Sequence, residues 1–158
     1  MSAVMQQNNQ QVFRWVTFRL ADEIYGINVM QVQEVLRMTD VAPVPGAPHF
    51  VMGIINLRGN VVTVLDTRKL LDLATSDITD SSRIMIIESG KVTVGLLVDS
   101  VAEVVNIALS DIDPPPSVGN DEGSRYIQGV YSSDQQILIL IDLNKLINEE
   151  NRDSIGMF

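Results

Sequence analysis

Few side chains in this sequence are of the types that perform catalysis or hold metal ions. His49 is the single histidine, and the chain has no cysteine. One histidine without cysteine builds neither a familiar zinc site nor a Ser-His pair, and without cysteine there is no thiol chemistry and no disulfide. We therefore expect His49, between Pro48 and Phe50, to be a loop histidine with no chemical role.

Acidic residues gather in one region of the second half of the chain. Asp111, Asp113, Asp121 and Glu122 could suggest calcium, but three prolines at 114–116 divide them and their spacing is not that of an EF-hand. We expect solvated loop carboxylates. No phosphate-binding loop or dinucleotide fingerprint is present, and no carboxylate pair is marked out for acid–base work. The sequence predicts no catalytic residue, no metal and no cofactor, which favours a binding module over an enzyme.

Two charged residues stand beside apolar runs and could act in recognition. Glu34 lies in the segment 29–37, and Arg58 follows the apolar run 51–57. If both project from one structural unit, they could form an ion pair beside an exposed apolar stripe; otherwise they are solvated surface charges. Exposed ion pairs contribute little to stability, so the importance of such a pair would lie in recognition.

Composition and charge limit the possible partners. The 158 residues are 46% apolar and 20% charged, with a net charge of −9, which is typical of an acidic globular protein. This charge disfavours nucleic acid and anionic membrane surfaces as partners. Residues 1–11 are polar, lack the features of a signal peptide and are expected to be a disordered arm, and no apolar run is long enough for a membrane span. We expect a cytoplasmic protein without direct membrane insertion.

The elements that must position Glu34 and Arg58 are mostly short strands. Apolar alternation and turn residues predict strands at 16–20, 24–27, 51–57, 61–65, 83–88, 92–98, 126–131 and 137–141. Residues 58–60 form the turn of a hairpin. The spacing of apolar residues predicts a helix over 29–37 with Asn28 at its N-cap, and a short closing helix near 143–147.

The two halves of the chain resemble each other. Gly53 aligns with Gly129 at an offset of 76 residues, and Glu34 aligns with Glu103 at an offset of 69. The difference of seven residues fits within the proline-rich loop of the second half. Hydrophobic hairpins can look alike by chance, but the repeat favours two similar small β-units packed face to face, with a groove at their seam where partners bind.

The segment Asn56-Leu57-Arg58-Gly59, with the following 61–66, resembles the signature of the CheW-like domain. Segments 18–20, 25–27, 32–36, 44–48, 94–99 and 126–129 fit the same family in the same order. The resemblance covers about residues 13–148. It implies a mainly β protein: two small SH3-like five-stranded β-barrels packed together, with a few short helices. The expected layout is one domain over 12–148, with halves of about 12–75 and 82–148, and a C-terminal tail at 149–158.

The resemblance also implies a role. Proteins of the CheW family are non-catalytic adaptors that couple methyl-accepting chemoreceptors to the histidine kinase CheA in bacterial chemotaxis arrays. They bind the regulatory domain of CheA by barrel-to-barrel contact and the cytoplasmic tip of the receptor in a groove. By position, Val32, Glu34, Gly53 and Arg58 match the receptor-binding residues, and Gly129 is the repeat equivalent of Gly53.

Other settings of the same domain stay open. The domain also occurs in the C-terminal part of CheA and, followed by a receiver domain, in CheV. A chain from Met1 to Phe158 leads us to expect a free adaptor. The sequence does not separate flagellar chemotaxis from a non-flagellar chemosensory pathway such as twitching or second-messenger control. The second half has Ser132-Ser133-Asp134-Gln135 where the first has the Asn-Leu-Arg-Gly tip, so the halves are not expected to be interchangeable.

Overall fold

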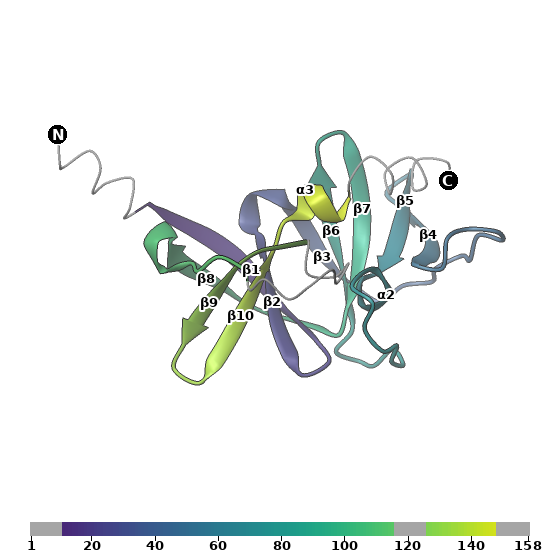
Figure 1. Cartoon of the computed structure of the whole chain (residues 1–158). Helices are drawn as coiled ribbons and strands as arrows, with labels where there is room; N and C mark the ends of the chain where they lie inside the picture. Colours follow the sequence, from purple (N-terminus) through teal and green to yellow (C-terminus); the bar gives the residue numbers. More distant parts are fainter. Residues whose placement is uncertain (1–10, 116–125, 148–158) are drawn as a thin grey trace.

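Two five-stranded sheets make up most of the protein (Figure 1). The structure is a computed structural model that describes residues 11–115 and 126–147. The predicted fold class, mainly β and SH3-like, is confirmed. The strands are β1 (Val12–Leu20), β2 (Glu23–Asn28), β3 (Val32–Arg37), β4 (Val51–Leu57), β5 (Asn60–Asp66), β6 (Arg83–Ser89), β7 (Val92–Val98), β8 (Ser100–Ala108), β9 (Ile127–Ser133) and β10 (Gln136–Ile141). The short helices are η1 (Val29–Gln31), α2 (Thr67–Leu70), η2 (Leu109–Asp111) and α3 (Leu143–Leu146). Residues 1–10 of the predicted arm, Asp121, Glu122 and the predicted tail lie outside the described residues.

The two halves of the repeat exchange strands. Sheet A has the order β8-β1-β2-β10-β9, and sheet B has the order β3-β6-β7-β5-β4. Each sheet therefore takes a hairpin from one half and three strands from the other. The halves are joined at four pairings: the parallel pairs β2 with β10 and β5 with β7, and the antiparallel pairs β1 with β8 and β3 with β6. The halves are similar, as the repeat indicated, but the two packed units do not coincide with them. Sheet A is at the left and sheet B at the right in Figure 1.

The apolar side chains form three hydrophobic clusters. Successive side chains of a strand point to opposite faces, so one strand can contribute to two clusters. The largest cluster lies between the sheets and joins residues of both, among them Phe18, Ile27, Leu65 and Leu96. A second cluster lies on the other face of sheet B, and a third, which includes Trp15, lies on the other face of sheet A. The shared cluster makes the two sheets one packed unit.

The helix predicted over residues 29–37 is wrong beyond its first turn. Asn28 does cap a helical turn, since its Oδ1 accepts a hydrogen bond of 2.9 Å from the N–H of Met30, but this turn is η1 and ends at Gln31. Residues Val32–Arg37 then form β3, which pairs with β6. Valine is β-branched and favours strands, and pairing with an apolar strand outweighs the helical spacing.

A β-bulge explains why strand β8 was not predicted. β8 is the repeat equivalent of β3, and both strands carry a register shift near their beginning: between Val32 and Glu34 in β3, and opposite Val16 and Phe18 of β1 in β8. A β-bulge inserts one residue and breaks the alternation of apolar and polar side chains. In β8 three exposed residues follow one another, so the alternation by which a strand is recognised in a sequence is lost.

Asp99 links the two sheets at the end of β7. Its carboxylate accepts hydrogen bonds from the backbone N–H of Ala21, at the turn between β1 and β2, and from Arg68 in α2. Burial by itself raises the pKa of Asp99, but the hydrogen bonds from Arg68 and Ala21 and the charge of Arg68 outweigh it, so the pKa lies below its ordinary value. A carboxyl group with a lowered pKa stabilises the folded state above the unfolded pKa, and this contribution is lost as the pH falls through the folded pKa.

We expect Asp99→Asn to lower the free energy of unfolding by about 1 kcal/mol at pH 7. The Asp99 side chain is 32% exposed, so solvent screening keeps the loss modest. The difference from the unchanged protein should shrink below about pH 4, where the carboxyl group in the unfolded chain begins to be protonated, and should vanish as the pH falls through the lower pKa of the folded state. Urea unfolding at pH 7 and pH 3 measures it, with the exposed Asp40→Asn as the control. An equal loss at both pH values would contradict the charged link.

Candidate functional site

Glu34 and Arg58 form an ion pair at the edge of sheet B. Glu34 lies on β3, and Arg58 lies at the tip of the β4–β5 hairpin, so the pair joins two elements that are not hydrogen-bonded neighbours in the sheet. Both guanidinium Nη atoms donate to the two carboxylate oxygens of Glu34, one of them at 3.2 Å. The side chains are 70% exposed for Arg58 and 30% for Glu34. Of the two possibilities that the sequence left open, an ion pair and separate solvated charges, the structure shows the ion pair.

The backbone conformation of the β4–β5 turn fixes the position of Arg58. Arg58 and Gly59 are the two residues between β4 and β5, and both have positive φ angles, 51° and 89°. Two successive positive φ angles are those of a tight hairpin turn whose twist matches the strands. The Asn56 side chain accepts a hydrogen bond of 2.8 Å from the N–H of Gly59, which holds the turn closed. Arg58 is therefore held outward from a rigid tip.

Electrostatics in this pair favour the charged forms. The hydrogen bond from Arg58 lowers the pKa of Glu34, although partial burial opposes it, and the Arg58 charge adds to the lowering. The hydrogen bond and the charge of Glu34 raise the pKa of Arg58 in turn. A fixed, bidentate pair of opposite charges on an exposed edge offers both a donor and an acceptor to a partner.

The two glycines of the predicted site are buried. Gly53 lies in β4 and Gly129 lies at the equivalent position of β9 in the other sheet. At each of them a segment that bridges to the edge strand passes close by: Ala42 bridges to Ile54, and Asp113 bridges to Val130. A Cβ atom on Gly53 would lie 2.3 Å from the carbonyl oxygen of Ala42. The glycines allow this close passage of the backbone, so any effect they have on a partner would be indirect.

Val32 and two exposed apolar residues lie on the strands that carry the ion pair or lead away from it. Val32 begins β3, is half-buried and packs against the cluster between the sheets. Val35, next to Glu34, is 40% exposed, and Val61, at the beginning of β5, is 62% exposed. Val61 was not predicted as a site residue. Its signal in the sequence is its place directly after the turn, where a strand extends into solvent.

Among the residues that the structure describes, those that could have done chemistry lie apart from one another. His49 is exposed and packs edge-on against Phe50, with ring centroids 5.7 Å apart. Asp111 ends η2, and Asp113 forms the backbone bridge to β9. Within residues 11–115 and 126–147, no group of three or more His, Cys, Asp or Glu side chains is placed to hold a metal ion. The same residues contain no helix long and apolar enough to cross a membrane.

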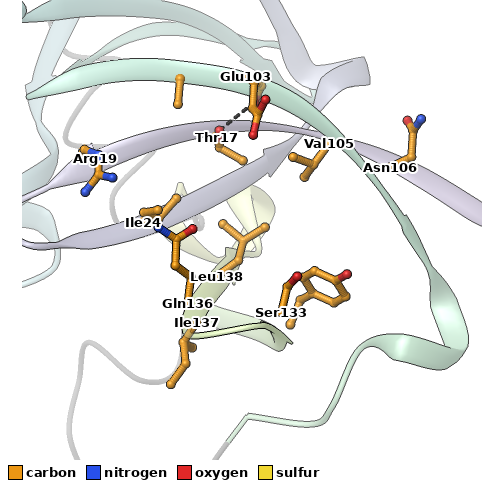
Figure 2. A pocket seen from close by; sticks show the side chains of 12 residues that line it. Thr17, Arg19, Ile24, Glu103, Val105, Asn106, Ser133, Gln136, Ile137 and Leu138 are labelled. Carbon is orange, nitrogen blue, oxygen red and sulfur yellow. Dashed lines mark hydrogen bonds between the residues drawn. The ribbon is translucent and has the colours of Figure 1, made fainter.

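Sheet A contains a pocket of about 390 Å³ (Figure 2). Residues from all five of its strands line it, including Thr17 of β1, Glu103 of β8 and Leu138 of β10. Thr17 is buried, and its hydroxyl donates a hydrogen bond of 2.6 Å to the backbone carbonyl of Glu103. Nothing in the sequence analysis indicated a pocket here; Glu103, one of its lining residues, was singled out only as the repeat equivalent of Glu34.

Two SH3-like sheets with a shared core and an exposed charged edge define a small β-sheet binding module. The chain belongs to the CheW-like domain family, whose model matches residues 14–151. Because proteins of this family are non-catalytic scaffolds, the protein is a chemotaxis scaffold and not an enzyme.

Relatives match over nearly their whole length. The chain is 32% identical to Chemotaxis protein CheW of Treponema pallidum, over 94% of this chain and 89% of that protein. It is 31% identical to Protein FrzA of Myxococcus xanthus, over 88% of each chain. Among solved structures, it is similar to the scaffolding protein TtCheW from Thermoanaerobacter tengcongensis, with a TM-score of 0.80, 33% identity, and coverage of 89% of this chain and 91% of that one.

Proposed function

We propose that the protein couples methyl-accepting chemoreceptors to the histidine kinase CheA in the cytoplasmic signalling arrays of bacterial chemotaxis. The exposed Glu34–Arg58 ion pair is the observation that carries this proposal for the receptor side. A receptor tip is a helical hairpin, and a helix that packs beside this pair can form charged hydrogen bonds with both of its members. Val32 and the exposed Val61 offer apolar contact nearby.

The kinase binds elsewhere in this proposal. The regulatory domain of CheA is built like this protein, so barrel-to-barrel contact between similar sheets is the expected mode. The scaffold then holds receptor and kinase at the same time without acting on either chemically. Gly53 and Gly129 contribute by letting the bridging segments pass close to β4 and β9, which sets the position of the β4–β5 hairpin and of its counterpart.

Arg58→Glu tests the receptor side. We expect it to weaken receptor binding by about tenfold or more, because it places a carboxylate beside Glu34 and reverses the charge that a partner meets. The melting temperature should hardly change, since the pair is exposed. Kinase binding should stay within a few-fold. Thermal melts, a CheA pull-down and a receptor-array kinase activation assay measure the three effects.

Two further variants separate recognition from structure. Arg37→Glu changes an exposed arginine on β3 by the same charge and should leave receptor binding intact. The double substitution Glu34→Arg with Arg58→Glu restores an ion pair with the charges reversed. If the receptor contacts each charge individually, its binding to this variant stays weak. A large fall in melting temperature for Arg58→Glu would show that Arg58 is structural. Lost kinase binding with intact receptor binding would show that the two surfaces are assigned the wrong way round.

A second candidate is a coupling protein of a non-flagellar chemosensory pathway. Protein FrzA, which carries a different name from the chemotaxis CheW proteins, matches this chain to a similar extent. The identity of the kinase recovered with the protein from cells decides between the two pathways.

A further inference from the structure

The faces of the two sheets that point away from the shared cluster are filled differently, and the repeat shows why. In sheet B, Ile86, Leu57 and Leu36 pack in the hydrophobic cluster. At the offsets of the repeat, 69 for β1–β3 and 76 for β4–β5, their equivalents in sheet A are Thr17, Ser133 and Val105. Each is smaller than its counterpart, and two carry a hydroxyl group. All three line the pocket. The pocket in sheet A thus lies where sheet B is filled with side chains.

Of the two residues in the ion pair of sheet B, only the glutamate has an equivalent of the same type in sheet A. Glu103 is the equivalent of Glu34 and lines the pocket. Asp134 is the equivalent of Arg58, at the tip of the β9–β10 hairpin, and its φ angle of 52° matches the 51° of Arg58. A carboxylate at this tip cannot form an ion pair with another carboxylate. Among the described residues, no cation forms an ion pair with Glu103.

The charges around the pocket favour a cation. Arg19 is the single cation in its lining, and a smaller cleft that adjoins it through Arg19 adds two carboxylates, Asp22 and Glu23. With Glu103, the linings of the pocket and its adjoining cleft together hold three acidic residues and one basic residue. Ile24 and Leu138 form an apolar part of the lining. Such a surface suits a side chain with an aliphatic stem and a charged head, because the stem packs while the head pairs.

We propose that the pocket in sheet A binds an arginine side chain of a partner protein, whose guanidinium pairs with Glu103 as Arg58 pairs with Glu34 in sheet B. The site is separate from the receptor surface at Glu34 and goes beyond the proposed function. A planar guanidinium matches a carboxylate with two parallel hydrogen bonds, as the pair within this chain shows. The hydroxyls of Thr17 and Ser133 and the amide of Gln136 lie around the same space (Figure 2).

The test uses the full chain, labelled with ¹⁵N, and a synthetic peptide that copies residues 54–63 and so presents Arg58 on a hairpin tip. We expect the peptide to shift the amide resonances of Thr17, Glu103 and Leu138. A peptide with citrulline, a neutral isostere, in place of Arg58 should bind at least about tenfold more weakly. Glu103→Gln should weaken binding of the arginine peptide to a similar degree.

Asp134→Arg should block the pocket from within the chain. It places an arginine where Arg58 stands in the other sheet, at a φ angle that Arg58 already tolerates. We expect it to lower peptide affinity at least about tenfold. Asp72→Arg is the matched control: Asp72 is exposed, has a φ angle of 59°, undergoes the same charge change and lies outside the pocket, so affinity should be retained.

Three results would overturn the proposal: equal binding of the citrulline peptide, unchanged affinity in Glu103→Gln, or shifts confined to sheet B. If Asp134→Arg fails to fold, Glu103→Gln decides. Agmatine, a small guanidinium compound, distinguishes a partner side chain from a free ligand. Agmatine that binds as tightly as the peptide would overturn the assignment to a protein partner.

Discussion

Residues 12–75, expressed alone, should give no cooperative thermal transition as a monomer. This fragment holds β1 to β5, yet β3 and β5 each have a sheet neighbour in the other half, β6 and β7, and β2 lies beside β10. Its two groups of strands belong to different sheets, and about 60 residues bury too little apolar surface to compensate. Circular dichroism melts and amide shift dispersion of the monomeric fragment measure the effect.

The matched control is the complementary fragment. Residues 76–158 alone should also lack a transition, whereas an equimolar mixture should recover one, because each sheet needs strands from both fragments. A monomeric 12–75 fragment that melts cooperatively, like the full chain, would show that the half is an independent folding unit and that the exchange is not needed for stability.

Gly53→Ala should lower the stability more than any other glycine-to-alanine substitution in the first half of the chain. The added Cβ would lie 2.3 Å from the carbonyl oxygen of Ala42 and 2.8 Å from the Cγ1 of Val41, and the φ angle of 155° is one that other residues rarely adopt. Backbone strain and overpacking each cost about 1–3 kcal/mol, which corresponds to a fall in melting temperature of roughly 5–15 °C. Differential scanning calorimetry measures it.

Gly46→Ala isolates the steric part of this effect. Gly46 also has a positive φ angle, 80°, but nothing lies within 4 Å of its added Cβ. Its cost should therefore be limited to about 1 kcal/mol of backbone strain. If Gly53→Ala kept its melting temperature but lost receptor binding, Gly53 would act as a contact residue, and the packing role assigned to it would be wrong.

Hairpins were the most predictable part of this fold. The β4–β5 hairpin was visible because a turn with glycine separates two apolar runs. The ion pair of Glu34 and Arg58 was one of two possibilities that the sequence left open, and only the structure distinguishes them. The nature of β3 was not visible, since its half-buried side carries Glu34, its exposed side carries Val35, and its valines fall at helical spacing. Pairing with β6, far along the chain, decides its structure.

The exchange of strands was not predictable for a different reason. β5 and β10 are both apolar on two faces and are equivalent in the repeat, so either could be drawn beside β2 or beside β7. Only the tertiary structure distinguishes the two pairings. The pocket was not predictable for the same reason. Thr17 and Ser133 indicate a cavity only when their larger counterparts are known to pack in the cluster of the other sheet.

The exchange of strands has a consequence for how a protein of this design depends on its own concentration. Two copies of a single repeat with strands like β1–β5 would have to exchange strands to form complete sheets, as in a domain-swapped dimer. The folded fraction of such a dimer falls on dilution. In one chain, each half is held near its complement at an effective concentration of about millimolar, whatever the amount of protein present. The scaffold therefore keeps its shape when it is scarce.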